Sequence, residues 1–247
     1  MRMQGLSHDT GPPSPQNPPS IVGMFDRIAH RYDLLNSLLS LGLDRRWRER
    51  AADLAALRPG DVALDVCTGT AGLALALAPR VGPTGRVVGV DLSLPMLTVG
   101  RRKAAGRSDG RQVALHLGDA LHLPYRDRTF NAAASSFAGR NVADLGRFFS
   151  EMARVVRRGG RVVFLELGEP QSGVLRRLYR WYFHRLAPLI GGLISGERED
   201  YRYLPQSVEA FASPETVARL MGEAGLKNVR YVPLMLGVAW VWVGTAG

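Results

Sequence analysis

Three aspartates stand at or near the ends of predicted strands, where a nucleoside could be held. Asp65 closes the short run before "CTGTAG", Asp91 closes "VVGVD", and Asp119 follows "VALHLG". A strand that breaks into a glycine-bearing turn and at once opens a helix brings bare backbone and a helix N-terminus to one place, which is typical of a ligand site. Either of the first two acids alone is equally well explained as a helix N-cap or turn former. Together they favour a ligand that carries a ribose.

The spacing within the glycine loop narrows the kind of nucleoside. Asp91 lies 22 residues beyond Gly69, where a carboxylate can accept hydrogen bonds from both hydroxyls of a ribose. The dinucleotide fingerprint G-x-G-x-x-G is incomplete, because Cys67 occupies the first glycine position and only Gly69 and Gly72 remain. The loop is therefore weak evidence for a dinucleotide.

Alternating segments must position these residues. Strand-like runs "DVALDVC", "GRVVGVDL", "VALHLGDA", "FNAAASSFAG" and "GRVVFLEL" are separated by helix-like ones, which predicts an α/β fold, a parallel sheet with helices on both faces. "VRYVPLML" and "VAWVWVG" then predict a hairpin at the sheet edge, giving a mostly parallel seven-stranded sheet with an antiparallel C-terminal strand. Asp119 and Ala120 are expected to end the third strand, where a carboxylate and a backbone N–H would read an adenine edge.

The remaining segments frame one domain over residues 21–247. Residues 1–20 are rich in proline and polar residues and are expected to be a disordered tail. Apolar residues from Met24 to Leu39 recur at helical spacing, which predicts one amphipathic helix within a helical cap over residues 21–58. Residues 171–210 are expected to form a basic and aromatic helical insertion that covers the substrate site. Its predicted apolar face comprises Leu175, Leu178, Tyr179, Tyr182 and Leu186, opposite Arg176, Arg180 and His184. That face predicts docking at an anionic membrane surface or, equally, packing on the core.

Composition excludes several classes of protein. The longest apolar run is interrupted by Pro233 and Gly237, so it is shorter than the roughly 18 residues that a membrane-spanning helix needs. A single cysteine forbids an internal disulfide and fits a reducing cytoplasm. The five histidines lack metal-ligand spacing, so no metal site is expected. The net charge of +10 comes almost entirely from arginine and implies either an anionic partner or a solvated surface.

Four blocks, in order from about Ile21 to the C-terminus, carry a resemblance: "MFDRIAHRYDLLNSLLSLGLDRRWR", "LDVCTGTAGLAL", "FAGRNVAD" and "YRYLPQSVEAF". They resemble the UbiE/MenG-like ubiquinone/menaquinone biosynthesis C-methyltransferases. The resemblance implies a Rossmann-like class I methyltransferase fold that uses S-adenosyl-L-methionine and releases S-adenosyl-L-homocysteine. The implied acceptor is a prenylated quinol, demethylmenaquinol or also a ubiquinone-pathway benzoquinol. Because an isoprenoid quinol resides in the bilayer, we expect a cytoplasmic protein that is peripheral at the inner face of the membrane. No nucleic-acid partner is expected, and homodimerisation is left open.

The resemblance also assigns site residues. The family's cofactor contacts fall on Thr70, Asp91, Asp119, Ala120 and Ser136 of this sequence. Asp65 and Gly69, the acid and the glycine of the loop, complete the predicted cofactor site. Arg140, Asn141 and Tyr32 are the catalytic candidates. Because arginine stays protonated, Arg140 is expected to stabilise a phenolate rather than to act as a base; the alternative is a surface pair with Asp144. Substrate contacts are expected from Asn36, Tyr201 and Tyr203. For the two tyrosines, packing in the core is an equal alternative.

Two departures from the family pattern bear on the site. Family members commonly carry an acid after "GTA", where this chain has Gly72, and "FGLRN" is here "FAGRN". The glycine at position 72 bears on how the glycine loop is held in place. The altered "FAGRN" block bears on the shape of the substrate pocket. Two other functions remain open: a methyltransferase for another small hydrophobic phenol or lipid, and, from the charge, a nucleic-acid methyltransferase or binding module. The latter lacks the base-stacking aromatics and catalytic motifs of such proteins.

Overall fold

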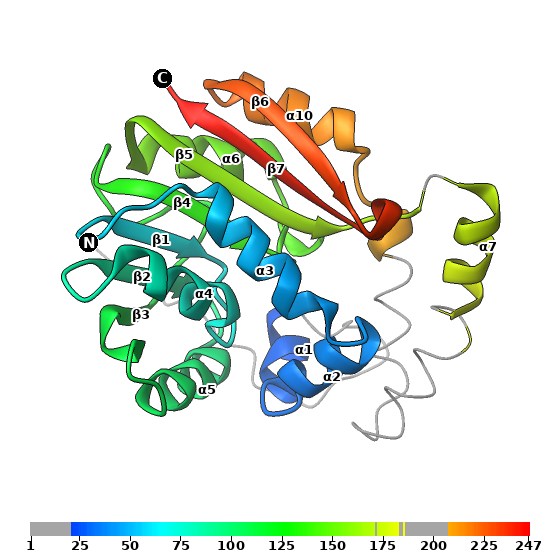
Figure 1. The fold of residues 1–247 in the computed structure, drawn as a ribbon, viewed down its shortest axis with the longest axis horizontal. Coiled ribbons are helices and arrows are strands. Elements are labelled where there is room, and N and C mark those ends of the chain that lie inside the picture. The colour runs from blue at the N-terminus through cyan, green and yellow to red at the C-terminus, as the bar shows by residue number, and fades with distance from the viewer. Residues whose placement is uncertain (1–20, 171, 183–184, 186–206) are drawn as a thin grey trace, which may run out of the picture.

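A computed structural model describes residues 21–170, 172–182, 185 and 207–247. Within them, seven strands form one sheet in the order β3-β2-β1-β4-β5-β7-β6 (Figure 1). The strands are β1 (Val62–Val66), β2 (Arg86–Asp91), β3 (Val113–Leu117), β4 (Phe130–Ser136), β5 (Val156–Leu167), β6 (Leu226–Leu234) and β7 (Ala239–Ala246). β7 runs antiparallel to β5 and β6, and the other neighbouring pairs are parallel. The predicted topology is confirmed, whereas Asp119 and Ala120 follow β3 instead of ending it.

Helices cover both faces of this sheet, as predicted (Figure 1). One face carries α3 (Leu43–Leu54), α4 (Gly72–Val81) and α5 (Leu94–Ala105), which pack into one buried cluster. The other carries α6 (Leu145–Val155) and α10 (Pro214–Glu223). Short 3-10 turns η1 (Gly110–Gln112), η2 (Gly139–Asn141) and η4 (Met235–Gly237) join these elements. The order of strands reverses between β1 and β4, and a ligand of an open α/β sheet binds beyond the strand ends at that point.

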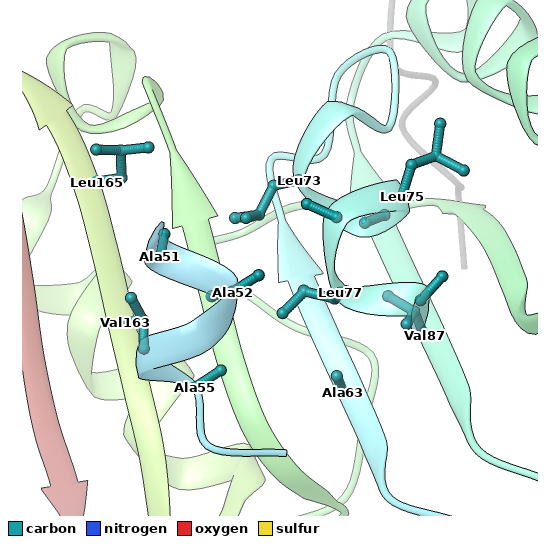
Figure 2. Packing of buried hydrophobic residues seen from close by; sticks show 14 of the residues in the cluster. Ala51, Ala52, Ala55, Ala63, Leu73, Leu75, Leu77, Val87, Val163 and Leu165 are labelled. Carbon is teal, nitrogen blue, oxygen red and sulfur yellow. The ribbon is translucent and has the colours of Figure 1, made fainter. Parts of the chain in front are cut away.

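Small side chains bring the helices close to the sheet on the α3 and α4 face. Ala51 and Ala52 of α3 are fully buried and lie near Leu73 and Leu77 of α4 and Val163 of β5 (Figure 2). The opposite face is filled with aromatic rings, where Phe148, Phe149 and Phe164 pack edge to face at centroid distances of 5.2 to 6.1 Å. Burial of this apolar area, worth about 25 cal/mol per Å², makes the sheet a rigid base for the loops above it.

The predicted helix from Met24 to Leu39 is wrong in one respect, because the chain forms two helices, α1 (Ile21–Ile28) and α2 (Tyr32–Leu39). A turn at residues 29–31 separates them, and the apolar spacing continues through this turn. Both helices are tied to the sheet layer by side-chain bonds. Ser93 Oγ, at the N-terminus of α5, donates to Asp26 of α1, and Thr70 Oγ1 of the glycine loop donates to Asp33 of α2.

α7 (Gly173–Trp181) is capped at its N-terminus by Ser172, whose Oγ accepts a hydrogen bond from Leu175 N. The predicted apolar face is divided: Tyr179 is buried, whereas Leu178 is 61% exposed and aligns with exposed Val174 and Trp181. In the described part of the chain, no helix is both long enough and apolar enough to cross a bilayer.

Candidate active site

The turn after β1 is fixed from below by Asp65. Its Oδ2 accepts hydrogen bonds from Thr68 Oγ1 at 2.6 Å and from Ala74 N at 2.8 Å. The residue is 1% exposed, and its second carboxyl oxygen has no hydrogen-bond partner. Burial raises the pKa of Asp65 to about 7, although its two hydrogen bonds and the charge of Arg48 act in the opposite direction. Asp65 therefore supports the loop from the interior.

Gly69 connects this turn to the end of β2. Its φ of +53° is unusual for residues with side chains, and the space where a Cβ would stand is open. Its N–H donates to Asp91 Oδ2 at 2.8 Å, while Ser93 N donates to Asp91 Oδ1 at 2.9 Å. Each carboxyl oxygen of Asp91 thus keeps a lone pair for a ligand hydroxyl. Burial raises the pKa of Asp91 despite these bonds.

A first cavity of about 320 Å³ opens above Gly69, and we call it the cofactor cavity. Seven predicted site residues line it: Gly69, Asp91, Asp119, Ala120, Ser136, Tyr32 and Asn141. Cap residues Val22 and Phe25 close one side, and Met96 and Leu121 add apolar surface. Asp119 accepts hydrogen bonds from Leu121 N and pairs with His122, and these interactions lower the pKa of its carboxyl although burial opposes them. A carboxylate for ribose hydroxyls beside apolar walls is the set of groups that a nucleoside needs.

A second cavity of about 180 Å³, which we call the acceptor cavity, lies between α2, α3, α7 and the turn before β7. Its walls are mostly apolar and aromatic, comprising Leu39, Leu41, Leu43, Trp47, Phe137, Leu167, Tyr179, Tyr182, Met235 and Val238. The polar groups are few, and Arg140 and Asn36 are among them. Flat apolar walls with a few polar groups suit an aromatic ring that bears oxygen atoms.

Arg140 is held by a buried carboxylate at the end of β5. Its Nε donates to Glu166 Oε1 at 2.7 Å, its backbone N to Glu166 Oε2 at 3.3 Å, and its Nη1 to Ser207 Oγ at 2.8 Å. The side chains of Arg140 and Glu166 are 6% and 0% exposed. The alternative of a surface pair with Asp144 is wrong, because Asp144 instead accepts a hydrogen bond from Arg147 N at the start of α6.

Two cap residues stand between the cavities. Tyr32 faces the cofactor cavity and Asn36, one turn later on α2, faces the acceptor cavity. Burial raises the pKa of Tyr32, opposed by Arg48, Asn36 and Arg140 in that order. The amide nitrogen of Asn36 is buried and has no partner within 3.5 Å; its interaction with the Tyr32 hydroxyl is longer than this, so its second hydrogen is available to donate to an oxygen of a bound ring.

Other predicted residues lie outside the lining. Thr70 Oγ1 donates to Asp33 Oδ1 at 2.6 Å and lies 3.3 Å from Lys103 Nζ, so it ties the cap to the loop. Tyr201 and Tyr203, the tail 1–20 and most of the predicted insertion 171–210 lie outside the described residues. Among the described residues, no group of three or more His, Cys, Asp and Glu could hold a metal ion.

Cys67, at the first glycine position of the fingerprint, lines the cofactor cavity. Burial first, and then the charges of Asp91, Asp65 and Asp119, raise the pKa of its thiol well above the usual value. The thiol therefore stays protonated, which disfavours a role as nucleophile.

Sequence reasoning also missed Glu166 and Trp47. Glu166 stands at the carboxyl end of a parallel strand, as Asp65 and Asp91 do, so the same positional rule would have found it. Trp47 gave no local signal, because only the fold of α3 brings it to the acceptor cavity.

The two departures from the family pattern have local compensations. A Cβ at Gly72 would lie 3.0 Å from Arg48 Nε, and Arg48 takes its carboxylate partner from Asp44. A Cβ at Gly139 would lie 2.5 Å from Phe164 Cζ, so the aromatic ring occupies that space in the core. The second departure therefore changes packing beneath the loop.

Comparisons with known proteins agree with this arrangement. The model of the ubiE/COQ5 methyltransferase family matches residues 16–246. The chain is 49% identical to the demethylmenaquinone methyltransferase of Thermus thermophilus, over 90% of this chain and 99% of the relative. It is 40% identical to the ubiquinone/menaquinone biosynthesis C-methyltransferase UbiE of Geobacter sulfurreducens, over 92% of this chain and 88% of the relative.

Solved structures agree on the fold. The crystal structure of a SAM-dependent methyltransferase from Aquifex aeolicus superposes with a TM-score of 0.58 at 18% identity, covering 81% of this chain and 89% of that one. At this identity the likeness bears on the fold, and it matches the class I topology described above. The family match, the sheet and the cofactor cavity lead to one conclusion: the chain belongs to the ubiE/COQ5 methyltransferase family and is an S-adenosylmethionine-dependent methyltransferase.

Proposed function

We propose that this enzyme methylates a ring carbon of a prenylated quinol, converting demethylmenaquinol to menaquinol. The observation that carries the proposal is the junction of a cofactor cavity with an apolar acceptor cavity that contains Arg140 and the Asn36 amide. The names of the relatives support the choice of a quinol. A ubiquinone-pathway benzoquinol is a second acceptor of the same chemistry, and another small hydrophobic phenol or lipid is the alternative class.

The residues of the cofactor cavity fit S-adenosylmethionine. Asp91 would accept both ribose hydroxyls, since each of its oxygens already holds one backbone N–H and retains a lone pair. Asp119 and the backbone of Ala120 would bind the adenine edge, and Gly69 and Ser136 would contact the chain of the cofactor. When bound, the cofactor supplies an electrophilic methyl group on a sulfonium sulfur.

The acceptor needs an electron-rich ring carbon, which a deprotonated quinol hydroxyl provides. Arg140 would stabilise that phenolate oxygen, and the Asn36 amide would donate to an oxygen of the ring. The ring carbon then forms the bond to the methyl carbon, the methyl–sulfur bond breaks with its electron pair left on sulfur, and the ring carbon loses its proton. Asn141 and Tyr32, which line the cofactor cavity, would orient the methyl donor or a water that accepts this proton.

The test separates the cofactor residues from the acceptor residues. Asp91→Asn should weaken cofactor binding by roughly 10- to 100-fold, because a hydrogen bond to a charged group contributes about 1.5–3 kcal/mol. Arg140→Lys keeps the positive charge but loses the planar guanidinium with its several hydrogen-bond donors. This variant should lower kcat by about 100-fold while leaving the cofactor Kd unchanged.

A second acceptor variant guards against misfolding, because Arg140→Ala would strand Glu166 as an unpaired buried charge. Arg140→Met combined with Glu166→Gln removes both charges together. Cofactor binding by calorimetry and labelled-methyl transfer to reduced demethylmenaquinone are measured for all variants. Full transfer activity in both Arg140 variants would refute the role given to Arg140.

We further propose that the mouth of the acceptor cavity docks on an anionic membrane surface, where a prenylated quinol resides. Leu41 and Met235 line the cavity and are 79% and 56% exposed, and the neighbouring Leu236 is 76% exposed. All three have a left-handed backbone, with φ between +48° and +58°, which apolar side chains rarely adopt. Such strain on exposed apolar residues is typical of functional surfaces.

Helix α7 extends the same surface. Tyr182, just after α7, lies 3.4 Å from the Leu39 carbonyl through its hydroxyl, which places the end of this helix beside α2. Exposed Val174, Leu178 and Trp181 follow one stripe of the helix, and exposed Arg177 and Arg185 supply positive charge for lipid phosphates. These residues support docking on anionic lipid.

A further inference from the structure

Phe137 stands where the two cavities meet. Among the described residues that line them, it is the one common to both. The turn that follows sends Arg140 to the acceptor cavity and Asn141 to the cofactor cavity. A group that passes between cofactor and acceptor must therefore pass beside the Phe137 ring.

The backbone at Phe137 is held in a strained conformation. Its φ is +59°, a region that bulky side chains avoid because of contact with their own backbone. The Phe137 N–H donates to the Leu165 carbonyl at 2.8 Å, which continues the pairing of β4 with β5 by one residue. Strain of this kind persists where surrounding structure imposes it, and it is concentrated at functional sites.

The ring of Phe137 is also fixed on its outer side. The Arg48 guanidinium carbon lies 5.0 Å from the ring centroid, and the Trp47 ring meets it edge-on at 6.4 Å between centroids. Arg48 is itself paired with Asp44, so the cation is not free to swing away. Phe137 is 8% exposed. A phenyl ring clamped in this way is a rigid wall.

We propose that Phe137 is a positioning and specificity-determining residue that separates the methyl donor from the acceptor ring. This inference rests on the proposed function. The clamped ring limits the group that can project from the cofactor sulfur to about one carbon and packs against the acceptor ring, holding its reactive carbon in line with the methyl–sulfur bond. The strained backbone is the cost of placing an aromatic ring at this position.

The test uses an S-allyl analogue of the cofactor, in which three carbons replace the methyl. Phe137→Ala and Phe137→Gly remove the wall, and glycine also relieves the strain at positive φ, so that at least one variant folds. The matched control is Phe25→Ala, because Phe25 lines the cofactor cavity but not the acceptor cavity.

The first readout is binding, measured by calorimetry without any acceptor. The wild type should bind the S-allyl analogue about tenfold more weakly than S-adenosylmethionine, and both Phe137 variants should close this gap. Phe25→Ala should weaken the binding of both donors and keep the gap. The second readout is transfer to the quinol, where the Phe137 variants should raise the ratio of allyl to methyl transfer and the KM of the quinol.

The possible outcomes test the role of Phe137 separately from the proposed methylation of a quinol. A wild type that binds the cofactor but leaves the quinol unmethylated refutes the proposed acceptor, and the binding readout still tests the wall. Phe137 variants that bind S-adenosylmethionine yet keep the wild-type gap between donors would overturn the proposal. An unchanged allyl-to-methyl ratio with an unchanged quinol KM would overturn it as well.

Discussion

The buried carboxyl of Asp65 makes the stability of the fold depend on pH. Its pKa of about 7 in the folded protein exceeds the value of about 3.9 expected in an unfolded chain. The folded state therefore binds more protons between these two values. It follows that the contribution of Asp65 to the free energy of unfolding falls as pH rises from about 4 to about 7, and is constant above that range.

We predict that Asp65→Asn flattens this dependence, since the amide oxygen still accepts a hydrogen bond from Thr68 or Ala74 but cannot ionise. Urea unfolding of wild type and variant at pH 5, 6, 7 and 8 checks the prediction. Equal slopes of unfolding free energy against pH in the two proteins would show that another group carries the dependence.

The pair of Gly139 and Phe164 offers a second test at this scale. Gly139→Leu restores the leucine of the family pattern and should destabilise the protein by roughly 1–3 kcal/mol, because the Phe164 ring fills that space. Phe164→Ala alone leaves a cavity and should cost about 3–5 kcal/mol. The double variant should be more stable than the sum of the two losses by about 1 kcal/mol or more. Additive losses in urea unfolding would mean that the two positions are independent.

At the scale of elements, the cap forms one wall of the cofactor cavity. α1 and α2 supply Phe25 and Tyr32 to the cofactor cavity, and the bond from Ser93 to Asp26 holds α1 against the start of α5. Asp26→Ala removes this tie while leaving Ser93 to cap α5 through Met96 N.

We predict that Asp26→Ala raises the dissociation rate of S-adenosylmethionine about two- to tenfold, the range for one lost hydrogen bond, with a smaller change in the association rate. Stopped-flow fluorescence measures both rates. Asp53→Ala is a matched control, because it removes an exposed carboxylate of α3 that pairs with Arg80 and does not line the cofactor cavity. A dissociation rate unchanged from wild type would mean that α1 is not a barrier to release.

Some features of the fold and of the site could be predicted from the sequence, and others depend on tertiary structure. The sheet and its covering helices follow from local alternation, and Asp91 and Asp119 were found because acids after parallel strands share one edge. The break between α1 and α2 was missed because the apolar spacing runs through it. Helical spacing placed Leu178 and Tyr179 on one apolar face but did not tell which residues the core covers, and the structure buries Tyr179 and exposes Leu178. Glu166 could have been found by the same rule for acids at strand ends, but its pairing with Arg140, 26 residues away, could not be predicted from a local pattern.

At the scale of the whole molecule, the positive charge of +10 and the apolar mouth of the acceptor cavity should act together on a membrane. We predict that Leu41→Asp and Leu236→Asp each reduce binding to vesicles that contain anionic lipid by about tenfold, since burying a leucine contributes roughly 1.5–3 kcal/mol. Aspartate tolerates a left-handed backbone better than leucine, so both variants should fold.

Vesicle sedimentation over a range of salt concentrations measures this effect, with Leu117→Asp as control, because Leu117 is 58% exposed on β3 at the opposite edge of the sheet. Salt should weaken the binding of every variant by screening the lipid charge. Equal losses in the control and in the mouth variants would assign binding to charge alone.

The most direct test of the central claim is the identity of the methylated product. The wild-type protein is incubated with S-adenosylmethionine labelled in its methyl group and with reduced demethylmenaquinone in liposomes, and the product is analysed by mass spectrometry and NMR. We predict that the label appears on a ring carbon, with one equivalent of S-adenosylhomocysteine for each quinol methylated. Label on a quinol oxygen, or no label on the quinol while the protein binds the cofactor, would contradict the account.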